Sequence, residues 1–468
     1  MNACLTEYFR CPEECAPFAW GGEPSLGCGY FRFGKDATCF GNCSGHSPAQ
    51  DCYGGLHDAL SDVKTSDGKI VLPFDPSEVV LNLHRELYIR EWRSGLLSTL
   101  AKAYYLIRPL LSVGVRKYLQ KLHLRDWDKL PFPRWPVDTS VDDLLEELIL
   151  LALSKQGVER IPFIWFWPEG KSACAMMTHD VETEEGRKYC PTLMDLDESF
   201  GIRASFQVIP EQRYSVAPEF LQSIRDRGFE VVIHDLNHDG HLYESREQFV
   251  ERAARINSYG RDFHSDGFRA AVLYRKQVWY DALKFSFDMS VPNVAHLDPQ
   301  RGGCCTVKPY FIGDILELPV TMIQDYTLFH ILNDYSIEIW KKQSSLILAK
   351  HGLMSFIVHP DYVMKSREQG VYRSLLKHIV QMGQEENVWI STPGQVNRWW
   401  RLRSRMKLAE ADNSWRIEGE GNERARIAWA HVVDGRVVFS LGGQADTVGA
   451  MHAGVSGPDV SRVNPQLA

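Results

Sequence analysis

Short apolar runs alternate with segments of helical apolar spacing from residue 162 to about residue 400. Two helical segments carry end signals: Gly228 follows the one over 218–227, and Ser245 and Gln248 form a capping-box pattern at the start of 245–259, which Gly260 follows. This alternation predicts parallel strands joined by helices. So many units in one stretch fit an α/β barrel of seven or eight (β/α) units better than an open sheet. The predicted strands are 173–178, 204–209, 230–234, 267–270, 285–290, 315–319 and 355–358.

Changes in composition divide the chain into five regions. The first is rich in Cys and Gly with little apolar periodicity, and the last is rich in Gly, Ala, Ser and Pro, which predicts disorder. Asp434-Gly435 is expected to form the hairpin turn of a small β unit after the barrel. The predicted regions are an irregular module (1–57), a helical region (76–160), the barrel (162–402), a β appendage (411–442) and a tail (443–468).

The helical region contains four amphipathic patterns. Three of them predict helices over 78–93, 96–106 and 113–124. Thr139 or Ser140 is expected to cap the fourth, with Asp142 and Asp143 in its first turn. The basic residues between 108 and 125 are interpreted either as a membrane-contacting surface or, preferably, as the solvated face of a packed helix.

Charge and hydropathy exclude some classes of function. The net charge of −8 argues against a nucleic-acid-binding protein, and no apolar run reaches the roughly 18–20 residues that span a bilayer. The first 15 residues lack the basic and apolar segments of a secretion signal. We therefore expect a cytoplasmic protein, with peripheral contact at the inner face of the membrane as an option, and the sequence leaves its oligomeric state open.

Seven of the 11 cysteines lie in the first 52 residues. In a cytoplasmic protein most of them should be reduced thiols. Cys11 and Cys15, and also Cys39 and Cys43, are four residues apart, so the four thiolates could hold a structural metal ion. Because the spacing is not C-x2-C, we favour unpaired or partly oxidised cysteines.

Ionisable side chains follow the ends of five predicted strands. In a parallel β/α barrel these ends lie together at the catalytic face. Imidazoles four residues apart in an H-x3-H pair can bind one metal ion, and two histidines with a carboxylate leave an open position on it. Such a site supports hydrolysis of an amide or ester, with a second carboxylate as base and another histidine as acid. The strand-end segments are THDVE (178–182), HDLNHDGH (234–241), FRAA (268–271), DMS (288–290) and FIVHP (356–360).

In order and spacing this series resembles the polysaccharide deacetylases, carbohydrate esterase family 4, also called the NodB-homology domain. The resemblance covers residues 172–400 and includes GIRASFQV at 201–208, ILELPV at 315–320 and VWISTP at 388–393. It implies a distorted (β/α) barrel and an enzyme that removes N-acetyl, less often O-acetyl, groups from sugars.

The resemblance also implies roles for single residues. Asp180 corresponds to the general base, Arg269 to the residue that orients it, and His359 to the general acid. Asp288 corresponds to the acidic partner that tunes the acid. The backbone N–H of Val272 would help to hold the oxyanion.

For the metal, the resemblance implies His234 and His238 as ligands, with Glu182 as the carboxylate. His241 is an alternative ligand that we rank below His234, and His179 is expected to pack rather than to bind metal. Zinc suits such a site, and cobalt, nickel or iron would also fit.

Two departures from the family pattern leave alternatives open. Val181 stands where a second aspartate is usual, so either Glu182 or Asp180 supplies the carboxylate ligand. Arg269 is followed by Ala-Ala-Val rather than the usual Pro-Tyr, which changes the substrate groove. We predict a metal-dependent N-deacetylase acting on an acetamido sugar or glycan intermediate. The alternatives are hydrolysis of a small non-sugar amide, or a catalytically silent, metal-containing glycan-binding module.

Overall fold

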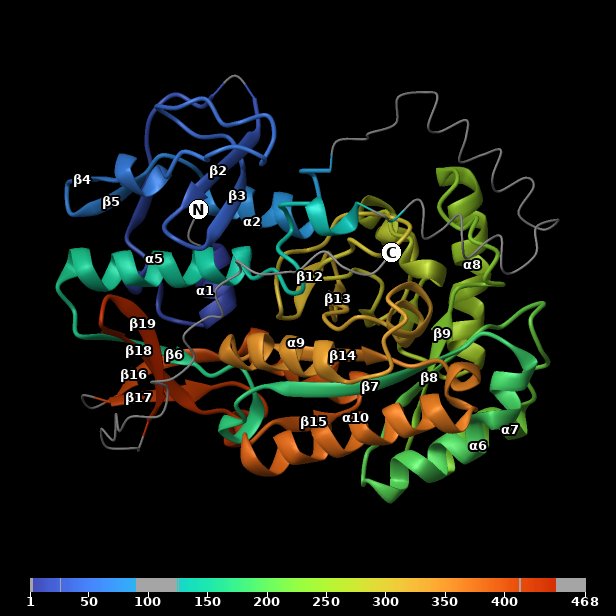
Figure 1. Ribbon diagram of the computed structural model, residues 1–468. Helices are drawn as coiled ribbons and strands as arrows, with labels where there is room; N and C mark the ends of the chain where they lie inside the picture. Colours follow the sequence, from blue (N-terminus) through green and yellow to red (C-terminus); the bar gives the residue numbers. More distant parts are fainter. Residues whose placement is uncertain (1–2, 26, 90–123, 125, 412–413, 443–468) are drawn as a thin grey trace, which may run out of the picture.

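The computed structural model describes residues 3–25, 27–89, 124, 126–411 and 414–442 (Figure 1). Its central sheet has the strand order β14-β7-β8-β9-β10-β11-β13-β12, and every neighbouring pair is parallel except β13–β12. Strand β15 also pairs with β7 in parallel. The strands are β7 (Cys174–Val181), β8 (Ser205–Val208), β9 (Glu230–His234), β10 (Gly267–Arg269), β11 (Phe287–Asp288), β12 (Tyr310–Ile312), β13 (Ile315–Glu317), β14 (Leu353–Ile357) and β15 (Trp389–Ser391).

Helices connect the strands, and the sheet curls into an open barrel (Figure 1). The predicted α/β barrel class is therefore confirmed. Two helices begin at side-chain caps, because Thr183 accepts a hydrogen bond from the Gly186 N–H (3.0 Å) and Ser245 accepts one from the Gln248 N–H (3.2 Å). The helices are α6 (Glu184–Ser199), α7 (Pro218–Asp226), α8 (Arg246–Asp262), α9 (Glu338–Ala349), α10 (Ser366–Glu385) and α11 (Pro393–Arg405).

Helix α8 continues past the glycine that was expected to follow its end. A Cβ atom on Gly260 would lie 2.8 Å from the Phe285 ring. The glycine is therefore needed for the close approach of helix and ring, and it does not terminate the helix.

Alternate residues of β7 pack into two different cores. Ala175 and Met177 lie in the core formed with helices α6, α7 and α10, whereas Cys174 and Met176 lie in a core shared with the N-terminal region. Successive side chains of a strand point to opposite faces of the sheet. One face of β7 is thus covered by the barrel helices, and the residues before the barrel pack against its other face.

The N-terminal region extends beyond residue 57. Strand β1 (Phe18–Trp20) pairs in parallel with β5 (Lys69–Leu72), which also pairs with β4 (Lys64–Ser66), so the expected irregular module has no boundary there. A hairpin of β2 (Gly29–Phe33) and β3 (Ala37–Gly41) lies beside it. Helix α1 (Ala3–Phe9) begins the region. Helix α2 (Pro76–His84) overlaps the predicted helix over 78–93 only at residues 78–84. The predicted helices over 96–106 and 113–124 and the basic stretch over 108–125 lie outside the described residues, apart from 124.

The cysteines do not form the structural metal site that their spacing left open as the less favoured alternative. All 11 cysteines are free thiols, and within the part of the chain that the structure describes Cys11, Cys15, Cys39 and Cys43 belong to no group with metal-binding geometry. Burial raises the pKa of Cys11 to about 12 and the pKa of Cys39 well above its usual value. These thiols are protonated and pack as small apolar side chains.

Helix α5 (Ser140–Gln156) begins after Thr139, as predicted, but its acidic first turn is buried. Asp142 accepts hydrogen bonds from the Tyr8 hydroxyl (2.6 Å) and the Val307 N–H (3.1 Å). Its predicted leucine face packs into the core. The first turn of α5 therefore joins α1 to the barrel through one carboxylate.

The C-terminal β unit is joined to a strand before the barrel. Strand β18 (Ile427–Val433) pairs with β19 (Arg436–Leu441) and also with β6 (Arg160–Ile164), both antiparallel. The predicted turn Asp434-Gly435 joins β18 and β19. A second hairpin consists of β16 (Lys407–Ala411) and β17 (Ser414–Glu418).

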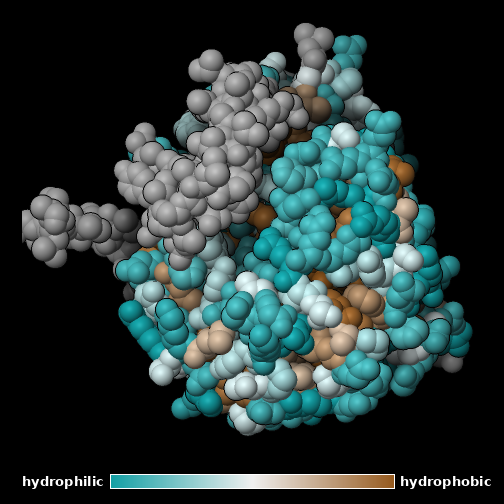
Figure 2. All heavy atoms as spheres, turned by 90° about the vertical axis from the view of Figure 1, so that its right-hand side faces the viewer, coloured by the Kyte–Doolittle hydropathy of each residue, from teal (hydrophilic) through white to brown (hydrophobic). Residues whose placement is uncertain are grey.

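Among the helices of the described residues, none combines the length and the hydropathy needed to cross a bilayer. The face toward which β7 runs is mostly hydrophilic, with apolar atoms visible in recesses between hydrophilic side chains (Figure 2).

Glu86 ties the N-terminal region to the barrel through a buried ion pair. Its carboxylate accepts a hydrogen bond from Arg275 Nε (2.7 Å), and the two side chains are 9% and 1% exposed. Removing one partner leaves a buried charge without compensation. We therefore expect Glu86→Ala to lower the free energy of unfolding by about 3–5 kcal/mol in urea denaturation.

The exposed pair Arg246–Asp281 provides the control, because its side chains are 40% and 69% exposed. Asp281→Ala should lower the free energy of unfolding by less than about 1 kcal/mol. Equal losses in the two variants would contradict the role assigned to Glu86.

Candidate active site

The end of β7 carries a carboxylate that is held by a buried guanidinium. Arg269 at the end of β10 donates from Nη1 to Asp180 Oδ1 (2.6 Å) and to Thr178 Oγ1 (2.8 Å), and from Nε to the Met289 carbonyl (3.0 Å). Arg269 is fully buried and Asp180 is 3% exposed. Burial favours the neutral acid, but the charges of Arg269, His234 and His359 outweigh it and lower the pKa of Asp180. This carboxylate is therefore ionised at neutral pH.

Three ligand atoms of metal-binding type lie together beside Asp180. Atoms of Glu182, His234 and His238 lie within 4.8 Å of one another. Glu182 Oε1 is 2.8 Å from His238 Nε2 and 3.8 Å from His234 Nε2. Both Nε2 atoms are buried and lack a hydrogen bond of good geometry to any described residue. Unsatisfied imidazole nitrogens facing a carboxylate fit a divalent cation.

Backbone contacts orient these ligands. His234 Nδ1 lies 3.2 Å from the Arg269 carbonyl oxygen, so a proton on Nδ1 leaves the Nε2 lone pair for a metal ion. His238 has a left-handed backbone (φ 55°), and Arg213 donates to its carbonyl oxygen (2.7 Å). The Tyr214 hydroxyl donates to the Val181 carbonyl (2.6 Å), which fixes the chain between Asp180 and Glu182.

The acid candidate His359 pairs with a carboxylate that the sequence analysis missed. Asp325 Oδ1 lies 2.7 Å from His359 Nδ1, and Asp325 Oδ2 accepts a hydrogen bond from the His359 N–H (2.7 Å). His359 Nε2 lies 3.4 Å from Glu182 Oε1. Burial lowers the pKa of His359, but Asp325 and Glu182 outweigh this effect and raise it well above its usual value. His359 is thus a protonated imidazole that can donate from Nε2.

The assignment of Asp288 as the partner of His359 is wrong. Asp288 accepts hydrogen bonds from the Ser290 hydroxyl (2.7 Å) and the Ser290 N–H (3.1 Å), and it lies opposite Glu317 in the register of β11 and β13. Burial raises the pKa of both carboxyls, and the charge of Asp288 adds to the rise at Glu317. Two carboxyls in such contact hold at least one proton at neutral pH, so this pair is a structural support and not a partner of the acid.

That support lies beneath the turn that follows Arg269. The Ser290 hydroxyl accepts a hydrogen bond from the Ala270 N–H (2.8 Å), and Asp235 Oδ2 accepts one from the Ala271 N–H (3.2 Å). The next residue is Val272, which has a left-handed backbone (φ 59°). A β-branched residue in that region is strained, so the surrounding contacts must hold the turn. The role of the Val272 N–H in binding an oxyanion stays a prediction.

The other two histidines lie apart from the three-ligand group. His241, the alternative ligand, is 44% exposed and its Nδ1 pairs with Glu244 (2.5 Å). His179 is fully buried between Asp197 (2.9 Å from Nε2) and the Val358 carbonyl (3.0 Å from Nδ1). Neither contributes a ligand atom to the group.

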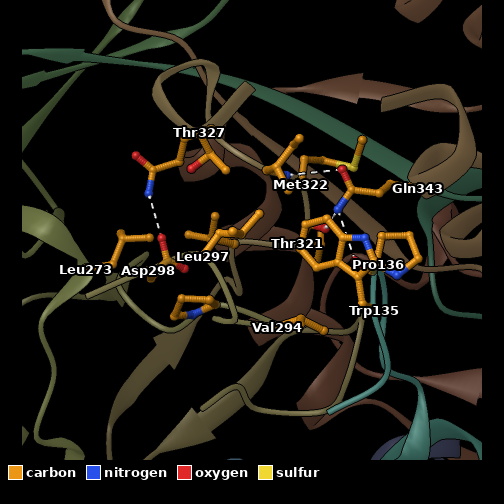
Figure 3. A pocket seen from close by; sticks show the side chains of 14 residues that line it. Trp135, Pro136, Leu273, Val294, Leu297, Asp298, Thr321, Met322, Thr327 and Gln343 are labelled. Atoms are coloured by element: carbon orange, nitrogen blue, oxygen red, sulfur yellow. Dashed lines mark hydrogen bonds between the residues drawn. The ribbon is translucent and has the colours of Figure 1, made fainter. Parts of the chain in front are cut away.

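A small cavity lies near the same ends of β10, β11 and β13, with an empty volume of about 350 Å³ that includes space open to solvent (Figure 3). Trp135 and Pro136 form one wall, Leu273 lies on another, and Gln324 donates to Asp298 Oδ1 (3.4 Å). Burial raises the pKa of Asp298 to about 6. A segment before the barrel thus contributes to the wall of this cavity, whose lining includes none of the three-ligand group, Asp180 or His359.

Comparison with known proteins gave structural matches alone. No family model matches the sequence, and a search of curated proteins found no significant match. A protein described as a polysaccharide deacetylase from Mycobacterium smegmatis is 18% identical, with a TM-score of 0.43 over 54% of this chain and 98% of its own.

Two further solved structures have similar coverage. Puue allantoinase is 12% identical, with a TM-score of 0.40 over 50% of this chain and 92% of its own. A family 4 acetyl xylan esterase from Clostridium thermocellum, solved with a cobalt ion, is 11% identical, with a TM-score of 0.32 over 48% of this chain and 91% of its own. Polysaccharide deacetylases and family 4 esterases, the family that the motif series resembles, are thus among the matched structures.

Metal binding can be tested at the two histidines between which the sequence left a choice. We expect purified wild-type protein and His241→Ala to carry about one equivalent of divalent metal by elemental analysis, and His238→Ala to lose it. The two variants differ by the same change, three residues apart in one loop. Loss of metal in His241→Ala, or its retention in His238→Ala, would contradict the three-ligand group.

The Asp288–Glu317 pair predicts a pH-dependent stability. Because the pKa of Glu317 is raised in the folded state, that state binds more protons than the unfolded one above pH 4.5, and stability is lost as pH rises. Glu317→Gln keeps a neutral group at every pH. Its free energy of unfolding relative to wild type should therefore increase between pH 5 and pH 8, by up to about 1.4 kcal/mol per pH unit.

Urea denaturation across that pH range checks the prediction, with Glu219→Gln on the exposed face of α7 as the control. A pH-independent difference for Glu317→Gln would show that Glu317 is ionised in the folded protein.

Proposed function

We propose that the chain is a metal-dependent hydrolase that removes an N-acetyl group from an acetamido sugar or a glycan intermediate. One observation carries the proposal: an ionised carboxylate and a protonated imidazole both border the same three-ligand group. Asp180 Oδ2 lies 3.8 Å from His234 Nε2, and His359 Nε2 lies 3.4 Å from Glu182. The lowered pKa of Asp180 keeps it unprotonated and the raised pKa of His359 keeps it protonated at neutral pH, and these are the states that a base and an acid need at the start of amide hydrolysis.

Glu182, His234 and His238 would hold the cation, and their two nitrogens and one carboxylate suit zinc or another divalent transition metal. When bound, such an ion supplies Lewis acidity, which polarises the substrate carbonyl and lowers the pKa of water. On this assignment Asp180 is the base and Glu182 the carboxylate ligand.

The protein groups then divide the proton transfers. Asp180 accepts a proton from the water that adds to the carbonyl carbon, while Arg269 keeps the carboxylate in place. His359 donates the proton on Nε2 to the nitrogen as the C–N bond breaks, which yields acetate and an amine. Asp325 holds the other ring nitrogen and stabilises the imidazolium before that transfer. The Val272 N–H donates to the oxyanion.

The same geometry gives less support to the two alternative functions, a silent glycan-binding module and a hydrolase of small non-sugar amides. A silent binding module would not need both the Asp180–Arg269 and the His359–Asp325 pairs. A small non-sugar amide is the alternative suggested by the sequence, because Ala270, Ala271 and Val272 follow Arg269 in place of the Pro-Tyr pattern of the family that the chain resembles. The cytoplasmic location and a lipid-linked or nucleotide-linked substrate remain predictions from the sequence.

Acetate release tests the proposal on a panel of N-acetylated oligosaccharides, nucleotide-linked N-acetyl sugars, cyclic ureides and small amides. We expect Asp180→Asn to lower kcat by about 10²–10⁴-fold because the base is lost, and Asp325→Asn by about 10²-fold because the acid is no longer oriented. Asp226→Asn on the exposed end of α7 is the matched control and should keep full activity.

Metal-loaded wild-type protein that hydrolyses no member of the panel would contradict the proposal. Hydrolysis of the small amides alone would replace the sugar by the alternative substrate class.

A further inference from the structure

Three aromatic rings form a wall beside the acid. The centroid of the Tyr362 ring lies 4.8 Å from that of His359, 5.8 Å from that of Tyr326 and 5.1 Å from that of His330. The ring centroids of Tyr326 and His330 are 5.2 Å apart. All three members of this aromatic wall (Tyr326, His330 and Tyr362) are half-buried, so part of each ring surface stays accessible. Aromatic rings next to a catalytic group are well placed to contact a substrate.

The aromatic wall and the acid are built as one unit. Asp325 Oδ1 accepts a hydrogen bond from the Tyr326 N–H (2.8 Å) and also binds His359 Nδ1. The Tyr362 N–H donates to the His359 carbonyl oxygen (3.1 Å). His330 lies in the π-helical turn Thr327–Ile331, a conformation that is frequent at functional sites. A substrate that contacts the wall is therefore held at a fixed distance from His359.

The wall includes the Tyr362 hydroxyl, on the ring that lies beside His359. This hydroxyl makes no hydrogen bond with any residue that the structure describes. Burial raises the pKa of Tyr362, and the charges of Glu182, Asp361 and Asp325 raise it further, which shows that these carboxylates are its electrostatic neighbours. A neutral phenol O–H on a ring beside His359 is available as a donor to a bound ligand.

We propose that Tyr362 is a specificity-determining residue that binds the sugar ring bearing the acetamido group, its hydroxyl hydrogen-bonding a hydroxyl of that ring and its ring packing, with Tyr326, on the apolar face. The inference rests on the proposed function and deepens it from amide hydrolysis to recognition of a hydroxylated ring. A pyranose has an apolar C–H face and a polar rim, and a tyrosine offers the matching pair of an apolar ring and a polar tip. A small amide without ring hydroxyls would use neither.

Tyr362→Phe separates the hydrogen bond from the ring contact. With an N-acetylated oligosaccharide, we expect KM to rise about three- to tenfold, the effect of one neutral hydrogen bond, and kcat to change less than about twofold. With the small ester 4-nitrophenyl acetate, both constants should stay within about twofold of wild type. Tyr362→Ala should raise KM for the oligosaccharide about tenfold beyond the value for Tyr362→Phe.

Tyr189→Phe is the matched control, because Tyr189 is also half-buried and its hydroxyl accepts a hydrogen bond from Gln369 (2.6 Å) on the outer side of the barrel. Binding of the deacetylated oligosaccharide by titration calorimetry gives a readout that needs no turnover. Wild type and Tyr189→Phe should bind it, and Tyr362→Ala should bind it at least about tenfold more weakly.

If the Tyr362 variants lost activity equally on the oligosaccharide and on the small ester, Tyr362 would only support His359, and the inference would be overturned. Unchanged KM in Tyr362→Phe and Tyr362→Ala would overturn it as well. In both cases the wild-type activity on the oligosaccharide would leave the proposed function intact. A metal-loaded wild type inactive on both substrates would instead overturn the proposed function, and this inference with it.

Discussion

The buried contact between Arg269 and Asp180 is the interaction on which the site depends. A guanidinium without solvent access is tolerated only when it is paired and hydrogen-bonded, and Arg269 meets this condition by joining β7 to the chain after β11. The same residue orients a ligand, because its carbonyl oxygen faces His234 Nδ1. Its backbone also leads into the strained turn at Val272. One position in β10 thus contacts the proposed base and a proposed metal ligand, and it precedes the turn that holds the predicted oxyanion donor.

The residues before the barrel contact the end of the turn that follows Arg269, through the ion pair of Glu86 with Arg275. The chain from Ala270 to Arg275 is held at its start by Ser290 and Asp235, and at its end by the ion pair of Arg275 with Glu86. Glu86 belongs to the N-terminal region, whose core is continuous with one face of the sheet. The left-handed backbone of Val272 is therefore stabilised by contacts from two regions of the chain. This gives the N-terminal region a part in the site that its own sequence does not suggest.

The sequence predicts the strands well because each is a short apolar run between turn signals, and it predicts the site residues that stand at strand ends. Asp325 could not be found in this way, since it lies eight residues after the end of β13, before a π-helical turn. Asp288 was misassigned because a strand-end carboxylate looks the same whether it faces the acid or another carboxyl. Gly260 and the cysteines show a similar limit: their roles depend on close packing, which only tertiary structure determines.

The distribution of aromatic side chains around the acid and the turn gives the site its character. Where the family that the chain resembles has Pro-Tyr after the arginine, this chain has Ala271 and Val272. A tyrosine stands beside the acid, at Tyr362, and Asp325 binds both the imidazole and the N–H of the neighbouring Tyr326. On the proposed function, these rings would contact the sugar from the side of the acid.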